Sequence, residues 1–321
     1  MEVTMPNGIK TALVLSGGSM KGTFQAGVIR ELLSRGLQPD AVYGISVGAL
    51  NGAYLANAAG EAARSGMKPD WQAIGRSLWD FWVRNIRTPR DVVRRRSTLK
   101  LAYAFLFKKF NGLTDAKPLY DLVRRTISEE NLQAAPLIFK VGCVNMGSGE
   151  LLVRDAGGGR LIEYILASAA IPVVMPLVKM ESAAADGDPV WLTDGGVRDV
   201  ALIGKAIGDG ADRIFCILCQ TERVSTAAYD FGNLIQYAER LMEIVVNETV
   251  NNDLETALRL NALLPEDGSP LKEGPLSGKR RVDIRVIRPP REPAIGLETF
   301  AADDVLRCLE MGRDAAKELR V

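Results

Sequence analysis

The sequence predicts an α/β fold, a three-layer sandwich in which helices flank a largely parallel central sheet. Two observations lead to this prediction. The first sixty residues alternate strand, helix, strand, helix, which is the order that builds a parallel sheet. Further apolar runs of strand length recur along the chain between helical segments. Because the 321 residues show no internal repeat and no long linker, we expect a single domain over residues 1–321.

The N-terminal elements have the clearest signals. Thr11–Leu15 is a short apolar run that ends in a glycine turn, which is typical of a strand. Residues 21–35 carry apolar side chains at helical spacing, and Gly36 is placed to end that helix. Residues 41–43 predict a second strand, and the small apolar residues 49–59 predict a second helix.

The remaining elements follow from the same two periodicities. Pro172 is expected to end the helix that precedes it. We predict further helices at 71–83, 118–127, 161–170, 231–260 and 302–319. We predict further strands at 137–145, 151–155, 173–180, 190–192, 213–219 and 282–287. Residues 265–281 are polar and rich in proline and glycine, so we expect a loop there.

Composition excludes several classes of protein. The chain is 47% hydrophobic with a formal net charge of +1, so it can bury a core and has no global attraction to nucleic acid. Cys216 and Cys219 have C-x-x-C spacing, but they lie in an apolar run and no histidine exists to complete a zinc site. We expect no metal and no cofactor. Without a signal sequence or a transmembrane run in these residues, a cytoplasmic protein is expected, with peripheral membrane contact as an option.

The strongest motif is a G-x-S-x-G pentapeptide, Gly44 to Gly48, with Ser46 at its centre. It lies between a predicted strand and a predicted helix, which is the context of a nucleophile elbow. Small residues two positions on either side let the backbone turn sharply and expose the hydroxyl. The following helix N-terminus favours developing negative charge. We therefore predict that Ser46 is a nucleophile, the alternative being an ordinary glycine turn.

A second glycine-rich loop, Gly17-Gly18-Ser19-Met20-Lys21-Gly22, also joins a strand to a helix. Its backbone N–H groups could converge on an anion. A Walker A loop is excluded because Lys21 precedes Gly22 instead of following it. A dinucleotide fingerprint would need Ser19 in place of its middle glycine and an acidic residue after the next strand, where Ser46 stands. An oxyanion hole for Ser46 accounts for both loops, and a tight packing turn is the alternative.

The third motif, Asp194-Gly195-Gly196, follows a predicted strand. Alone it is more often a simple Asp-Gly turn. The chain contains no histidine, so a Ser-His-Asp triad cannot form within it. A serine nucleophile still needs a general base. The remaining candidates are a carboxylate such as Asp194, a lysine near the elbow such as Lys21, or a bound water.

These motifs, together with Ala-Ser-Ala-Ala-Ile-Pro at 167–172, occur in the order found in the patatin-like phospholipase family, which the chain resembles over about residues 11–220. The resemblance implies that Ser46 is the nucleophile and Asp194 the base. It implies that the loop from Gly17 to Gly22 forms the oxyanion hole, with Lys21 where the family carries Arg or Lys. Residues 221–321 would form a C-terminal helical extension and a closing strand.

The resemblance also implies a substrate class, an acyl ester of a phospholipid or lysophospholipid, hydrolysed without a metal. One departure concerns Ser19, where family members usually have glycine. Serine tolerates positive φ poorly, so the oxyanion hole would be altered if this position needs that conformation. A non-catalytic lipid- or protein-binding module on the same fold is therefore the alternative function.

A basic segment completes the sequence features. Residues 84–109 contain nine Lys or Arg and one acidic residue, a charge of 9 − 1 = +8, with aromatic and leucine residues interspersed up to Phe110. Such a segment favours contact with an anionic membrane surface, here through 84–110. Nucleic acid is the lesser alternative and is not expected as a partner. A solvated helix face over a buried apolar stripe would produce the same pattern.

Overall fold

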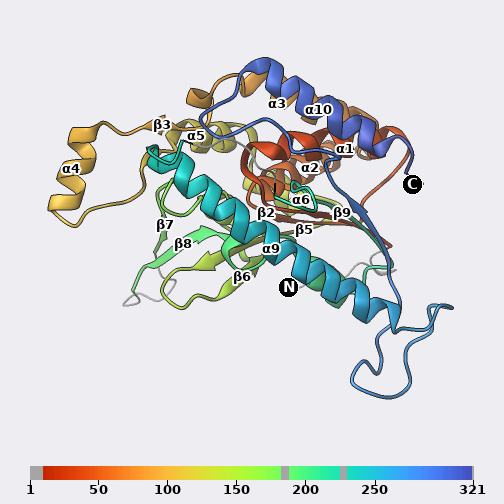
Figure 1. Cartoon of the computed structure of the whole chain (residues 1–321). Coiled ribbons are helices and arrows are strands. Elements are labelled where there is room, and N and C mark those ends of the chain that lie inside the picture. Colours follow the sequence, from red (N-terminus) through yellow and green to blue (C-terminus); the bar gives the residue numbers. More distant parts are fainter. Residues whose placement is uncertain (1–9, 182–187, 225–229, 320–321) are drawn as a thin grey trace.

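The computed structural model describes residues 10–181, 188–224 and 230–319, and these form a central sheet with helices on both faces (Figure 1). Most of the N-terminal segment in which we expect no signal sequence, residues 1–9, lies outside the described residues. Among the described helices, none has the length and apolar character needed to cross a bilayer.

The sheet is mixed and mostly parallel, as expected. Its strand order is β10-β9-β1-β2-β5-β8-β7, and β6 also pairs with β5. The run from β10 to β5 is parallel, whereas β6, β7 and β8 are antiparallel to their neighbours. The strands are β1 (Thr11–Leu15), β2 (Ala41–Ile45), β5 (Ile138–Asn145), β6 (Leu151–Arg154), β7 (Val178–Met180), β8 (Val190–Asp194), β9 (Arg213–Ile217) and β10 (Asp283–Ile287).

Helices pack on both faces of this sheet. One face is covered by α1 (Gly22–Ser34), α2 (Val47–Arg64), α3 (Trp71–Asn85), α5 (Lys117–Thr126), α6 (Glu129–Ala134), α7 (Leu161–Ser168) and α10 (Ala302–Ala316). The other carries α8 (Ile203–Gly208) and the second half of α9 (Leu234–Ala262), whereas the start of α9 packs with the first cluster through Ile235 and Ala238. Short 3-10 turns are η1 (Ser19–Lys21), η2 (Pro89–Asp91), η3 (Ala156–Gly158) and η4 (Gly195–Val197). Outside these layers lie α4 (Thr98–Leu106) and the small ladder of β3 (Arg94–Arg95) with β4 (Thr114–Asp115).

The core is divided by the sheet into two layers of side chains. In β1, Leu13 and Leu15 join the cluster under α1 and α2, while Ala12 and Val14 join the cluster under α8 and α9. Successive side chains of a strand point to opposite faces, so a strand buried on both faces reads as a continuous apolar run. This confirms the three-layer α/β prediction. Cys216 and Cys219 are buried and free, as expected of structural cysteines.

One predicted strand is much shorter than expected. Residues 173–180 were expected to be extended throughout, but only β7 (Val178–Met180) is a strand. Pro172 precedes Val173, whose φ of 67° turns the chain. The carbonyls of Val173 and Val174 then accept hydrogen bonds from Leu113 and Thr114, at 2.9 Å each, instead of from a sheet neighbour. The apolar run therefore forms a turn before the strand begins, with Val173 exposed and Val174 and Met175 buried.

Candidate active site

The sheet register brings Ser46 and Asp194 to the same edge. Ser46 follows Ile45, which pairs with Gly142 of β5. The next residue of β5, Cys143, pairs with Asp194 at the end of β8. β1 ends beside β2, so the glycine-rich loop after Leu15 reaches the same place. Three segments far apart in the sequence therefore meet at the carboxyl edge of the parallel strands, where α/β proteins usually bind ligands.

Ser46 lies on a sharp strand-to-helix turn. Its φ of 55° and ψ of −126° are unusual for a residue with a side chain, and it directly precedes α2. A Cβ on Gly48 would come within 2.2 Å of the Leu15 carbonyl oxygen, so only glycine fits there. The Ser46 N–H donates to the Ser168 hydroxyl at 2.8 Å, and that hydroxyl donates to the Gly142 carbonyl at 2.6 Å. The structure thus has the local geometry of a nucleophile elbow.

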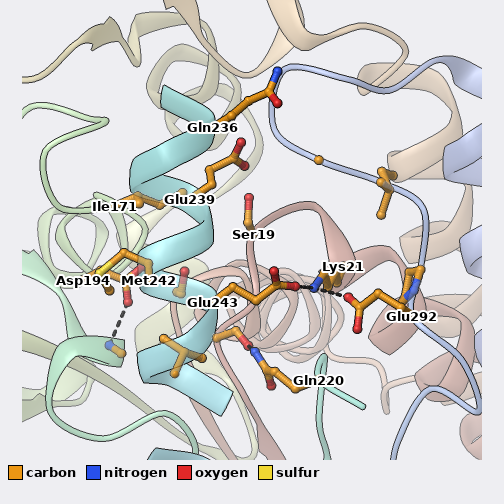
Figure 2. A pocket seen from close by; sticks show the side chains of 18 of the residues that line it. Ser19, Lys21, Ile171, Asp194, Gln220, Gln236, Glu239, Met242, Glu243 and Glu292 are labelled. Atoms are coloured by element: carbon orange, nitrogen blue, oxygen red, sulfur yellow. Dashed lines mark hydrogen bonds and ion pairs between the residues drawn. The ribbon is translucent and has the colours of Figure 1, made fainter. Parts of the chain in front are cut away.

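Asp194 is a buried carboxyl group facing Ser46. Its Oδ1 accepts a hydrogen bond from the Gly196 N–H at 2.8 Å, the contact drawn in Figure 2. Burial raises the pKa of Asp194 to about 6, and hydrogen bonds from the Ser46 hydroxyl and the Gly196 N–H oppose that shift. A carboxylate with this pKa is a better proton acceptor than an exposed aspartate and is still ionised at neutral pH.

The glycine-rich loop offers a different set of donors from the one expected. The Gly17 N–H already donates to the Val200 carbonyl at 2.9 Å, so it cannot serve an oxyanion. The N–H groups of Lys21 and Gly22 are likewise taken by carbonyls of the loop itself. Within the described residues, the N–H groups of Gly18 and Ser19 have no acceptor. An oxyanion hole in this loop would therefore use Gly18 and Ser19.

Ser19 adopts the conformation that serine disfavours. Its φ is 52°, and its buried hydroxyl oxygen has no hydrogen-bond partner in the described part of the chain. Figure 2 shows this hydroxyl pointing into the cavity toward Glu239. Position 19, where family members usually have glycine, therefore does need positive φ, and serine occupies it in this chain.

Residues from distant parts of the chain, none of them in the predicted motifs, hold the loop in place. The Gln220 amide donates to the Gly17 carbonyl at 2.8 Å, and the Gln25 amide donates to the Ser16 carbonyl at 2.9 Å. The Cys219 N–H donates to the Ser16 hydroxyl at 2.9 Å. These contacts come from α1 and from the chain after β9. No local motif identifies them, because they depend on strand order.

Lys21 is held between two carboxylates, Glu243 of α9 and Glu292 (Figure 2). Burial by itself would lower the pKa of Lys21, but the charges and hydrogen bonds of both glutamates outweigh burial and raise this pKa. The ammonium group therefore stays protonated at neutral pH and cannot accept the serine proton. This argues against the Ser-Lys alternative and leaves Lys21 as a structural link between the loop and α9.

A cavity of about 550 Å³ connects these groups and is lined by Ser46, Asp194, Gly18, Ser19 and Lys21, among others. The first half of α9 forms one wall, with Gln236, Glu239, Met242 and Glu243 facing inward (Figure 2). Burial raises the pKa of Glu239 to about 7. The hydrogen bond from the Leu297 N–H lowers this pKa, and the nearby charges of Glu298 and Glu243 raise it by smaller amounts. No motif in the sequence indicates this acidic wall, because its residues reach the cavity from α9 and from the chain after β10.

A serine on a strand–turn–helix elbow is the local structure of the nucleophile in α/β serine hydrolases. The chain belongs to the patatin-like phospholipase family, whose family model matches residues 13–207. This confirms the resemblance seen in the four ordered motifs.

Two known proteins are similar to the chain. It is 25% identical over 210 residues to the lysophospholipase nte1 of Aspergillus terreus. The aligned region covers 65% of this chain but only 12% of that protein. Its structure is similar to that of VipD from Legionella pneumophila with a TM-score of 0.39 and 14% sequence identity. That match covers 96% of this chain and 66% of VipD.

Proposed function

We propose that this chain is a serine acyl hydrolase that cleaves phospholipid or lysophospholipid esters with a Ser46–Asp194 dyad. The observation that carries the proposal is the pairing of two groups in one 550 Å³ cavity, a serine on a strained elbow and a buried carboxyl group that accepts its hydrogen bond. Family membership supports the lipid substrate. Among these esters, the fungal relative, a lysophospholipase, favours a lysophospholipid.

The reaction has two steps. Ser46 Oγ attacks the ester carbonyl carbon while the Asp194 carboxylate takes the hydroxyl proton, and the N–H groups of Gly18 and Ser19 stabilise the oxyanion. The protonated Asp194 gives its proton to the leaving alcohol, which leaves an acyl-serine. Water then attacks the acyl-serine, Asp194 takes a proton from that water and returns it to Ser46 Oγ, and the fatty acid is released.

The test is a set of three variants assayed on short-chain esters and on lysophospholipid. Ser46→Ala should abolish hydrolysis and labelling by a fluorophosphonate, with little change in thermal stability. Asp194→Asn keeps the shape and removes proton acceptance, so turnover should fall roughly 10²–10⁴-fold. Asp199→Asn is the matched control, because Asp199 is also shielded, with a raised pKa, but does not line the cavity. Normal turnover in Ser46→Ala would refute the proposal.

The alternative is a non-catalytic lipid-binding module. The positive φ and buried hydroxyl of Ser19 favour it, since both could disturb the oxyanion hole. Under this alternative the wild-type chain would bind lysophospholipid but would neither hydrolyse it nor react with the fluorophosphonate.

We further propose that residues 84–110 contact an anionic membrane. In this segment, α4 projects away from the body of the molecule at the left of Figure 1. Large apolar side chains there are exposed instead of covering a buried stripe, namely Leu99, Tyr103, Phe105, Leu106, Phe107 and Phe110. The lysines Lys100, Lys108 and Lys109 are exposed beside them. A basic and apolar projection is what an anionic lipid surface would bind.

A further inference from the structure

Ser46 also lines a second, much smaller cavity, of about 40 Å³. Apart from Ser19 and Ser46, every residue that lines it is apolar. Ser19, Ser46 and Ile171 line both this cavity and the large one. The candidate nucleophile therefore stands between two environments, a large cavity with charged walls and a small apolar one.

A third cavity, of about 30 Å³, continues from the second. The two share Leu50, Trp82, Ile86 and Leu119 in their linings. The third cavity extends as far as Ile127 and Ile165, in the core between α2, α3, α5 and α7. Each is large enough for a few water-sized groups, since one water needs about 10–15 Å³.

The two apolar cavities follow the first turns of α2. Val47 and Leu50 line the second cavity, and Leu50, Ala53 and Tyr54 line the third. Positions three and four apart lie on one face of a helix. From Ser46 to Tyr54 this face is about 12 Å long, at a rise of roughly 1.5 Å per residue. An apolar track thus leads from the Ser46 hydroxyl into the core.

We infer that this track binds the acyl chain of the substrate, while the large charged cavity holds the alcohol portion. The inference rests on the proposed function, because the acyl chain of the substrate enters the track only when the ester carbonyl carbon is beside Ser46. An acyl chain has no hydrogen-bonding groups beyond its carbonyl, which matches the second cavity, whose lining is apolar apart from the two serines. The third cavity is also mostly apolar, with Asn51, Tyr54 and Thr126 as its side chains that carry polar groups besides Trp82.

Two lining residues have different roles along the track. The Trp82 indole N–H donates to the Asn51 amide oxygen at 2.9 Å, and the Asn51 amide donates to the Gly22 carbonyl at 2.9 Å. This buried chain of hydrogen bonds makes Trp82 a fixed wall. The Leu119 side chain cannot form hydrogen bonds, and it lines both cavities where they meet. Leu119 therefore limits how much of the track a chain can occupy.

The experiment compares kcat/KM for p-nitrophenyl butyrate, octanoate and laurate. Leu119→Ala should join the two cavities and raise the laurate-to-butyrate ratio about 10-fold or more, since a single methylene in an apolar pocket changes the rate by that order. Leu132→Ala is the control, because Leu132 is also buried in the same core but lines neither cavity. Its ratio should match that of the wild type. An unchanged ratio in Leu119→Ala, or the same rise in Leu132→Ala, would overturn the inference.

A second variant guards against misfolding of the first. Ala53→Ile fills the third cavity from α2, so the same ratio should fall. Fluorophosphonates with short and long alkyl chains give a readout that needs no turnover, and their relative labelling rates at Ser46 should shift in the same directions. Failure of the proposed function is distinguishable, because Ser46→Ala would then hydrolyse all three esters as the wild type does.

Discussion

At the scale of single residues, the candidate dyad combines backbone strain with an unusual carboxyl group. A positive φ at a residue with a side chain costs roughly 1–3 kcal/mol and persists only where neighbouring contacts hold it. For Ser46, those contacts are the hydrogen bond to Ser168 and the close packing of Gly48 on Leu15. The Ser46 hydroxyl donates a hydrogen bond to Asp194, and burial raises the pKa of that carboxyl group toward the range in which histidine acts as the base of serine hydrolases.

The raised pKa of Asp194, about 6, predicts the pH dependence of hydrolysis. Only the carboxylate can take the serine proton, so kcat/KM should rise about tenfold per pH unit below 6 and level off above it. Glu239, with a pKa of about 7, lines the same cavity, and its titration could produce a similar rise of kcat/KM with pH. The profile should therefore be measured for wild type and Glu239→Gln. A midpoint near 6 in both identifies Asp194, and a flat profile between pH 5 and 8 would contradict its role as base.

The raised pKa of Asp194 also makes the stability of the fold depend on pH, and stability falls over the pH range in which hydrolysis should rise. Because the folded-state pKa of Asp194 lies above its ordinary value of 3.8, the folded chain holds this proton more tightly than the unfolded chain does. The contribution of Asp194 to stability is therefore fully present below pH 3.8 and is lost as pH rises to about 6. If Asp194 is the general base, hydrolysis should rise with pH over this window while the contribution of Asp194 to stability falls.

Ser19 gives a second prediction at this scale. Ser19→Gly removes both the cost of positive φ and a buried hydroxyl without a partner. Glycine gives the unfolded chain more conformational entropy, which offsets part of this gain. We expect the free energy of unfolding to rise by about 1 kcal/mol in total. Ser19→Ala is the matched control, since it removes the hydroxyl but keeps a Cβ at φ 52°. Urea unfolding should rank Gly above Ala, and an equal stability of both variants would show that the backbone conformation is not strained.

At the scale of elements, the sequence predicted best what is decided locally. The strands β1, β2, β5, β6 and β9 begin within a residue of the prediction, because each is an apolar run bounded by turn residues. Residues 173–180 failed because the positive φ of Val173 depends on contacts with Leu113 and Thr114, sixty residues away in the chain. The motifs with Ser46 and Asp194 were likewise local. Gln220 and Glu243, which hold the glycine-rich loop beside them, come from other elements, so no spacing rule could identify them.

The close packing of the elbow can be tested by a single substitution at Gly48. A methyl group at Gly48 would lie 2.2 Å from the Leu15 carbonyl oxygen, and a backbone atom cannot move aside. We expect Gly48→Ala to destabilise the fold by about 3 kcal/mol. Gly204→Ala is the matched control, because Gly204 lies in α8 with open space around its Cα. It should be neutral or slightly stabilising. Thermal unfolding of both would decide, and equal melting temperatures would contradict the close packing.

At the scale of the whole molecule, charge is distributed unevenly. The net charge is +1, and residues 84–109 carry +8, so the rest of the chain carries 1 − 8 = −7. Near the candidate active site, the cavity wall contributes Glu239, Glu243 and Glu292. An anionic bilayer would therefore attract the projecting segment and repel much of the remaining surface. Such a dipolar molecule would be oriented on the membrane as well as bound to it.

Not every cation of the segment is available for this purpose. The Arg95 guanidinium donates to both oxygens of Glu298, with Nε at 2.6 Å from Oε1, so it ties the base of the segment to the chain before α10. The lysines around α4, namely Lys100, Lys108 and Lys109, are exposed and lie among the exposed aromatic and leucine side chains. They are the better residues for testing membrane contact.

We predict that replacing Lys100, Lys108 and Lys109 with Gln weakens binding to anionic vesicles roughly 100-fold at low salt. Each cation near such a surface is worth about 1 kcal/mol, and the effect should fade at high salt because the Debye length is then about 3 Å at 1 M. The control replaces three exposed lysines elsewhere, Lys68, Lys272 and Lys279, and makes the same change in net charge. If only net charge matters, both triple variants lose the same affinity in co-sedimentation, and docking through α4 is wrong. If α4 is the contact, the control binds as the wild type does. Hydrolysis of a soluble short ester should be equal in all three proteins, because none of these lysines lines the cavity with Ser46.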